Sequence, residues 1–82
     1  MKSILNIGFN NIILTERIVS VVSVNAAPVK RLIDELRRKQ KVVNATAGRK
    51  VKSVIISDCG TLFLSALTPS TLSHRLSELQ ND

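Results

Sequence analysis

Apolar positions along the chain fall into short runs with strand periodicity, separated by turn residues. The clearest strand is residues 18–24, whose sequence IVSVVSV is rich in β-branched side chains. Turn residues predict a turn at Phe9-Asn10-Asn11 and a tight hairpin turn at Asp58-Cys59-Gly60, and Gly48 predicts a loop over 46–50. Further apolar runs predict strands at residues 4–7, 12–14, 41–45, 51–57 and 61–66.

The segment 26–39 has the strongest helical pattern. The predicted N-cap is Asn25, whose side-chain oxygen accepts a backbone N–H of the first turn. Pro28 is tolerated because first-turn amides have no helical partner, and the helix should end near Lys39-Gln40 with cations in its last turn. One predicted face carries four apolar residues at i, i+3, i+4 and i+7: Val29, Leu32, Ile33 and Leu36.

A second helix is predicted to begin at Pro69, with Thr68 as its N-cap. Its apolar face carries Leu72, Leu76 and Leu79. The resulting order is β-β-β-α-β-β-β-α, so we expect a single small α+β domain over residues 1–82. Because a strand follows the first helix, a helix-turn-helix DNA reader is disfavoured.

Composition adds an expectation about assembly. The chain of 82 residues has no Trp, no Tyr and two Phe, so its core must be aliphatic. Its mean hydropathy is +0.16, and the strands at 18–24, 53–57 and 62–66 are apolar on both faces. We expect this apolar surface to exceed what two short helices cover. Exposed apolar patches mark interfaces, so we predict a homo-oligomer with these strands at the contact.

Several classes of protein and site are excluded by composition. One cysteine and one histidine leave no material for an intramolecular disulfide or a multi-cysteine zinc site. No apolar run approaches the roughly 18 residues of a membrane span, and the first apolar stretch is too interrupted for a signal peptide. Cys59 and His74 lack an evident third orienting group, so we interpret them as a turn residue and a surface histidine. We expect no enzyme, no cofactor, no metal and no small-molecule substrate.

Charge is concentrated in the first part of the chain. Residues 1–52 hold 11 basic and 3 acidic residues, giving +8, and residues 53–82 hold 1 basic and 3 acidic residues, giving −2. The run 37–52 has seven cations and no acid. It is either a solvated surface or a polyanion-binding face. Arg49 and Lys50 beside Gly48 favour close approach to a phosphate backbone, and Arg17 is a weaker candidate.

The aromatic content bears on the kind of nucleic acid. Proteins hold single strands by stacking bases on aromatic side chains. Phe9 and Phe63 are too few and too apolar in context to supply such a platform. Duplex phosphates are therefore the better target.

An ordered set of short matches resembles the RemA family, bacterial regulators of extracellular matrix genes. The resemblance runs from about residue 4 to residue 76 without an evident gap. No single match is specific, whereas the ordered set is. The matching residues are Asn6-Ile7-Gly8-Phe9 with Asn11, Arg17-Ile18-Val19, Ala27-Pro28 with Lys30-Arg31, Ala45-Thr46 with Gly48-Arg49, Val54-Ile55-Ile56, Leu64-Ser65-Ala66 and Pro69.

This resemblance implies a cytoplasmic, nucleoid-associated activator of biofilm matrix genes. It implies a LytTR-like fold, a ring-shaped homo-oligomer (an octamer) and duplex DNA wrapped through weakly sequence-specific contacts. The family's DNA-contacting arginines fall on Arg17, Arg49 and Lys50 here. Lys50 replaces an arginine of the family, which keeps the charge but cannot bind a phosphate through two parallel N–H donors. Ala47 replaces the family's tyrosine, so any ring packing there is absent.

Two other interpretations of the basic surface remain open. The first is a structural or adaptor module whose partner is an acidic protein, with the positive charge steering the encounter. The second is an accessory role in RNA binding. Competition between duplex DNA, single-stranded RNA and an acidic polypeptide at matched charge discriminates among the three.

Overall fold

The computed structural model describes residues 3–80, which form an α+β fold in the predicted element order. Predicted strand ends differ from the observed ones by at most two residues. In chain order the elements are β1 (Ile4–Gly8), β2 (Asn11–Leu14), the 3-10 helix η1 (Thr15–Arg17), β3 (Ile18–Ser23), α1 (Ala27–Arg38), β4 (Val42–Asn44), β5 (Ser53–Ser57), β6 (Leu62–Ser65) and α2 (Pro69–Gln80).

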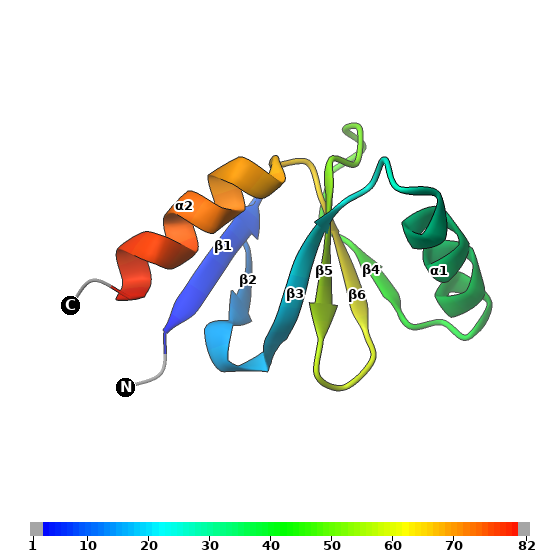
Figure 1. Cartoon of the computed structure of the whole chain (residues 1–82), viewed down its shortest axis with the longest axis horizontal. Coiled ribbons are helices and arrows are strands. Elements are labelled where there is room, and N and C mark those ends of the chain that lie inside the picture. The colour runs from blue at the N-terminus through cyan, green and yellow to red at the C-terminus, as the bar shows by residue number, and fades with distance from the viewer. Residues whose placement is uncertain (1–2, 81–82) are drawn as a thin grey trace.

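Four strands form the larger sheet, in the order β3-β5-β6-β4. β5 lies in the middle and pairs antiparallel with both β3 and β6. β4 pairs parallel with β6, because the chain leaves the β3 edge, passes through α1 and returns at the opposite edge (Figure 1). β1 and β2 form a separate antiparallel hairpin.

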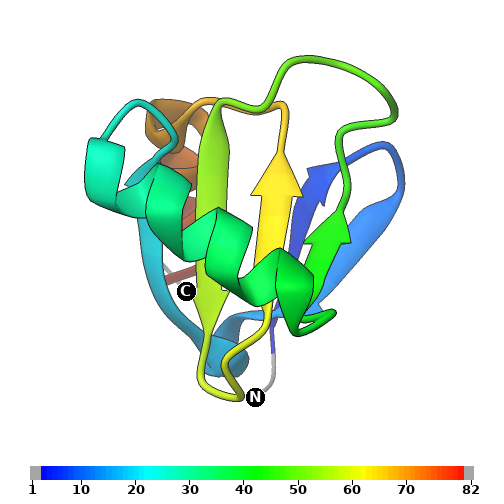
Figure 2. The ribbon, with the colours of Figure 1, turned by 90° about the vertical axis from the view of Figure 1, so that its right-hand side faces the viewer.

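The larger sheet is covered on both faces. α1 crosses one face, and the β1–β2 hairpin with α2 lies on the other side (Figures 1 and 2). Alternate residues of the sheet divide between these layers. Val54 and Leu64 pack with Ile33 of α1, whereas Ile55 packs with Leu72 of α2. All five side chains are at most 7% exposed, so the sheet separates two aliphatic clusters.

The expectation that apolar strand faces stay uncovered is wrong for β5 and β6. The hairpin supplies the missing cover, because Leu5 and Ile7 are each 1% exposed and pack on the same side as α2. Ser65 Oγ also donates a hydrogen bond to Ile7 O at 2.7 Å, which joins the sheet to the hairpin. The large apolar side chains that remain exposed lie on the hairpin and the two edge strands: Ile4, Phe9, Ile12, Leu14, Val19 and Val43.

Of the two predicted helix caps, one is confirmed and one is wrong. Thr68 Oγ1 accepts the backbone N–H of Thr71 at 3.1 Å, as expected for the N-cap of α2. The N-cap of α1 is Ala26, without a side-chain cap, instead of Asn25. The reason lies in Pro28, which has no N–H. With Asn25 as the N-cap, Pro28 would occupy the third helical position and remove one of the two backbone donors that a cap can bind.

Candidate functional site

Arg49 and Lys50 lie in the β4–β5 loop, at one end of the larger sheet (Figure 1). The loop contains a tight turn, in which the Arg49 N–H donates to Thr46 O at 3.0 Å. Ala47 and Gly48 occupy the middle of this turn with φ angles of 52° and 82°. Gly48 adopts such angles without steric cost. Thr46, the first residue of the turn, is 1% exposed, whereas Arg49, its last residue, is exposed to solvent.

The tip of the β1–β2 hairpin lies beside this loop. Its turn is Phe9-Asn10, with φ angles of 52° and 65°, and Asn11 belongs to β2 instead of the predicted three-residue turn. Asn11 Nδ2 donates to Gly8 O and Phe9 O at 3.0 and 3.2 Å, which fixes the turn. The Arg49 guanidinium carbon lies 5.5 Å from the centroid of the Phe9 ring, within the range of a cation–π contact.

The loop and the hairpin tip line a groove of about 410 Å³. Three exposed cations contribute to it: Arg49, Lys50 and Lys52. The other lining residues are Phe9, Ala66 and Leu67, so no lining residue is acidic. This arrangement gives a positively charged surface with an apolar wall.

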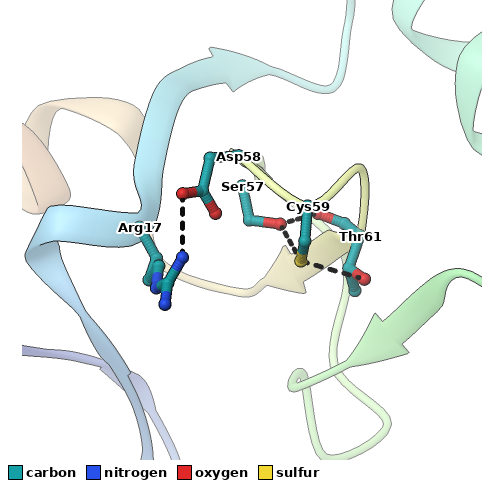
Figure 3. A network of polar contacts seen from close by, with 5 residues as sticks. All are labelled: Arg17, Ser57, Asp58, Cys59 and Thr61. Carbon is teal, nitrogen blue, oxygen red and sulfur yellow. Dashed lines mark hydrogen bonds and ion pairs between the residues drawn. The ribbon is translucent and has the colours of Figure 1, made fainter.

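Arg17 lies at the other end of the larger sheet. Its Nη1 donates to Asp58 Oδ2 at 3.2 Å, with side chains 64% and 43% exposed (Figure 3). Asp58 follows β5, whereas Arg49 and Lys50 precede it. Four residue steps along a strand span about 14 Å. The structure therefore brings Arg49 and Lys50 together and leaves Arg17 apart from them.

Cys59 is an exposed residue of the β5–β6 turn (Figure 3). Its Sγ lies 3.2 Å from Ser57 Oγ and 3.6 Å from Thr61 Oγ1. The hydrogen bond with Ser57, followed by those with Thr61, lowers the pKa of the Cys59 thiol from 9.0 to about 7. His74 Nε2 on α2 lies 3.4 Å from Glu78 Oε1. These placements match the predicted turn residue and surface histidine.

Alkylation of Cys59 is expected to accelerate as pH rises through about 7. The thiolate is the nucleophile, and its pKa is lowered in the folded protein. In denaturant the midpoint should move up to the ordinary thiol value of 9.0. Iodoacetamide labelling rates between pH 5 and 9 measure this, and Ser57→Ala should raise the midpoint of the folded protein. If the midpoint of the folded protein is the same in Ser57→Ala as in the wild type, this hydrogen bond does not set the pKa of Cys59.

Three residues have a part in these sites that the sequence pattern did not reveal. Phe9 is apolar in its sequence context, yet it is 48% exposed and contacts Arg49. Lys52 stood out only as a member of the basic run, and Asp58 only as a turn residue. A signal for Phe9 existed, because a large apolar side chain between Gly8 and Asn10 in a turn has little chance of burial.

Within residues 3–80, neither helix has the length and apolar composition needed to cross a bilayer.

Comparison with known proteins identifies the family. The chain is 47% identical over 75 residues to a protein of Halothermothrix orenii, covering 92% of this chain and 89% of that protein. It is 47% identical over 77 residues to one of Carboxydothermus hydrogenoformans (94% and 88%) and over 74 residues to one of Moorella thermoacetica (90% and 81%). All three bear the name "Putative regulatory protein".

The family model that matches covers nearly the whole chain. It is described as "RemA-like: Extracellular matrix regulatory protein A-like" and matches residues 4–76. This span agrees with the ordered set of matches seen in the sequence. The chain therefore belongs to the RemA-like family of regulatory proteins.

Proposed function

We propose that this regulatory protein binds duplex DNA by contacting phosphates, with little discrimination among bases. The observation that carries the proposal is the groove that Arg49, Lys50 and Lys52 line and to which no acidic residue contributes. Contacts from cations to phosphates fix a protein on a duplex and carry no sequence information directly. The regulatory names of the relatives support a role in gene control.

Assembly is the second part of the proposal. A protein with so few phosphate contacts binds non-specifically, with a dissociation constant of about 10⁻⁴–10⁻⁶ M at physiological salt. A ring-shaped homo-oligomer repeats the groove and multiplies the contacts along wrapped DNA. The β1–β2 hairpin offers an apolar surface for contact between copies, which consists of the exposed side chains Ile4, Ile12 and Leu14. The LytTR-like fold, the octamer, the nucleoid location and activation of matrix genes enter by the family resemblance alone.

Arg17 has a smaller part in this proposal than Arg49. The Asp58 carboxylate lies 3.2 Å from the Arg17 guanidinium and competes with a phosphate for it. Exposed ion pairs of this kind contribute about 0–1 kcal/mol, so the displacement is possible at a modest loss. We therefore expect Arg17→Ala to weaken DNA binding less than Arg49→Ala does.

Replacing Arg49 and Lys50 by Ala is expected to weaken duplex binding and to flatten its salt dependence. The slope of log K against log salt concentration should fall by about 0.9 for each phosphate that the variant no longer neutralises. Fluorescence anisotropy on one duplex over a salt series measures this slope. Circular dichroism checks that the fold is intact, because both side chains are exposed.

A control for charge alone is Lys30→Gln with Lys41→Gln, which also removes two exposed cations but lies outside the groove. It should change the slope less than the Arg49 and Lys50 pair does. Competition with single-stranded RNA and an acidic polypeptide tests the RNA and adaptor hypotheses. An acidic polypeptide that displaces DNA at matched charge, and binds with a flatter salt response, favours the adaptor.

A further inference from the structure

We propose that Phe9 is a positioning residue of the groove, whose ring holds the Arg49 guanidinium in place for phosphate. This inference rests on the proposed function, since Arg49 must contact DNA for its placement to matter. Phe9 itself lies in the turn between β1 and β2, and Arg49 lies in the β4–β5 loop, so the contact joins segments distant in sequence. Both line the same groove of about 410 Å³.

The two turns that meet at this contact have the same construction. Each has two central residues with positive φ: Phe9 and Asn10 in one, Ala47 and Gly48 in the other. Such turns are short and have little conformational freedom. Phe9 is therefore presented by a turn that Asn11 fixes with two hydrogen bonds, and Arg49 directly follows the other turn.

Folding alone does not account for phenylalanine at this position. A turn with two positive φ angles favours Asn, Asp or Gly, and a bulky residue in that region is strained. Phe9 has φ of 52° and remains 48% exposed, and it belongs to neither of the two core clusters. The turn thus carries a cost in both backbone strain and exposed apolar area. Strain of this kind collects at functional sites, and here the ring faces Arg49.

The contact suits the chemistry of phosphate binding. A guanidinium is planar, and all its N–H donors point outward in that plane. A cation–π contact with an aromatic ring leaves N–H groups of the guanidinium available to donate to phosphate oxygens. It also restricts a long side chain before binding, so less conformational freedom is lost when the phosphate is bound. Lys50 and Lys52 are point charges with no comparable geometry.

Phe9→Asn separates this role from a structural one. Asn is favoured in the turn, so the variant should be at least as stable as the wild type in urea unfolding. It lacks the ring, so affinity for a short duplex should fall about two- to five-fold for each copy of Arg49 that contacts the duplex. Phe9→Trp, which keeps an aromatic face, should retain wild-type affinity. A Phe9→Asn variant that binds as tightly as the wild type across a salt series would overturn the inference.

A double-mutant cycle with Arg49→Ala completes the test. Without Arg49, Phe9→Asn should cause no further loss of affinity, because the ring acts through the guanidinium. Equal losses with and without Arg49 would mean that Phe9 contacts DNA by itself, which also overturns the inference. The ring-current shift on the Arg49 side chain, read by NMR without DNA, should disappear in Phe9→Asn. If Arg49→Ala alone leaves DNA binding unchanged, both this inference and the assignment of DNA binding to the groove fail. If the wild-type protein does not bind duplex DNA at all, the proposed function itself fails. If Arg49→Ala weakens binding while Phe9→Asn does not, only this inference fails.

Discussion

Ile12→Asp is expected to leave the chain folded, to prevent the proposed assembly and to lower affinity for long duplex DNA by about 10²–10⁴-fold. Ile12 is 55% exposed and pairs with Asn6 on the outward face of the β1–β2 hairpin. In the isolated subunit an aspartate there stays in water. In a contact between copies its charge would be buried against apolar side chains, which is strongly unfavourable. The DNA affinity that depends on several linked subunits would be lost with the assembly.

Three measurements on the Ile12→Asp variant test this expectation together. Light scattering gives the mass, circular dichroism gives the fold, and titration on duplexes of increasing length gives the affinity. Lys30→Gln is a control with the same change in net charge at an exposed residue of α1, and it should stay oligomeric. Wild-type affinity should rise with duplex length and then level off. A folded monomer that binds long DNA as tightly as the wild type would show that assembly is not the source of affinity.

Leu72→Ala is expected to lower the free energy of unfolding by about 2–5 kcal/mol. Leu72 is fully buried, on α2, in the cluster with Leu5, Ile7 and Ile55. Removing its methyl groups leaves a cavity between α2, the hairpin and the larger sheet. Domains of ordinary stability have about 5–15 kcal/mol in total, so this single change removes a large fraction.

Urea unfolding followed by circular dichroism measures the effect. Leu32→Ala on α1 is the matched comparison, because it deletes the same atoms from a side chain that is only partly buried. It should shift the urea midpoint by less than Leu72→Ala. Equal shifts would mean that burial does not determine how much Leu72 contributes to the free energy of unfolding. If neither variant shifts the urea midpoint, the packing described for both helices is contradicted.

Local patterns predicted the elements of this fold well. The apolar stripe of α1 packs against the larger sheet, and the leucines of α2 pack against the other cluster. The predicted hairpin turn at Asp58-Cys59-Gly60 is confirmed by the antiparallel pairing of β5 with β6. The pairing of β4 with β6 and of β3 with β5 was not predictable, because it joins segments distant in the sequence. For the same reason the cover that the β1–β2 hairpin gives to β5 and β6 was missed. The predicted cap at Asn25 is wrong for a local reason, since Pro28 removes one of the two backbone donors that such a cap can bind.

For the candidate site too, adjacent residues were predictable from the sequence, whereas contacts between distant residues were not. Arg49 and Lys50 were predictable because they are adjacent in the sequence on a glycine-containing loop. Their separation from Arg17 follows from which end of the sheet each loop occupies, and no local pattern encodes that. The contact between Phe9 and Arg49 joins residues forty positions apart, so only the folded chain brings it into view.

The hydrogen bond from Ser65 to Ile7 O has a consequence for how the protein is made. The partners are 58 residues apart, and Leu5 is buried against Leu72, which is synthesised later still. Ribosomes add about 5–20 residues per second. The inner face of the hairpin therefore stays uncovered for about 3–12 seconds after its synthesis, until β6 and α2 have been made. During that interval the nascent chain exposes an apolar surface, which makes it a target for the chaperones that attend translation.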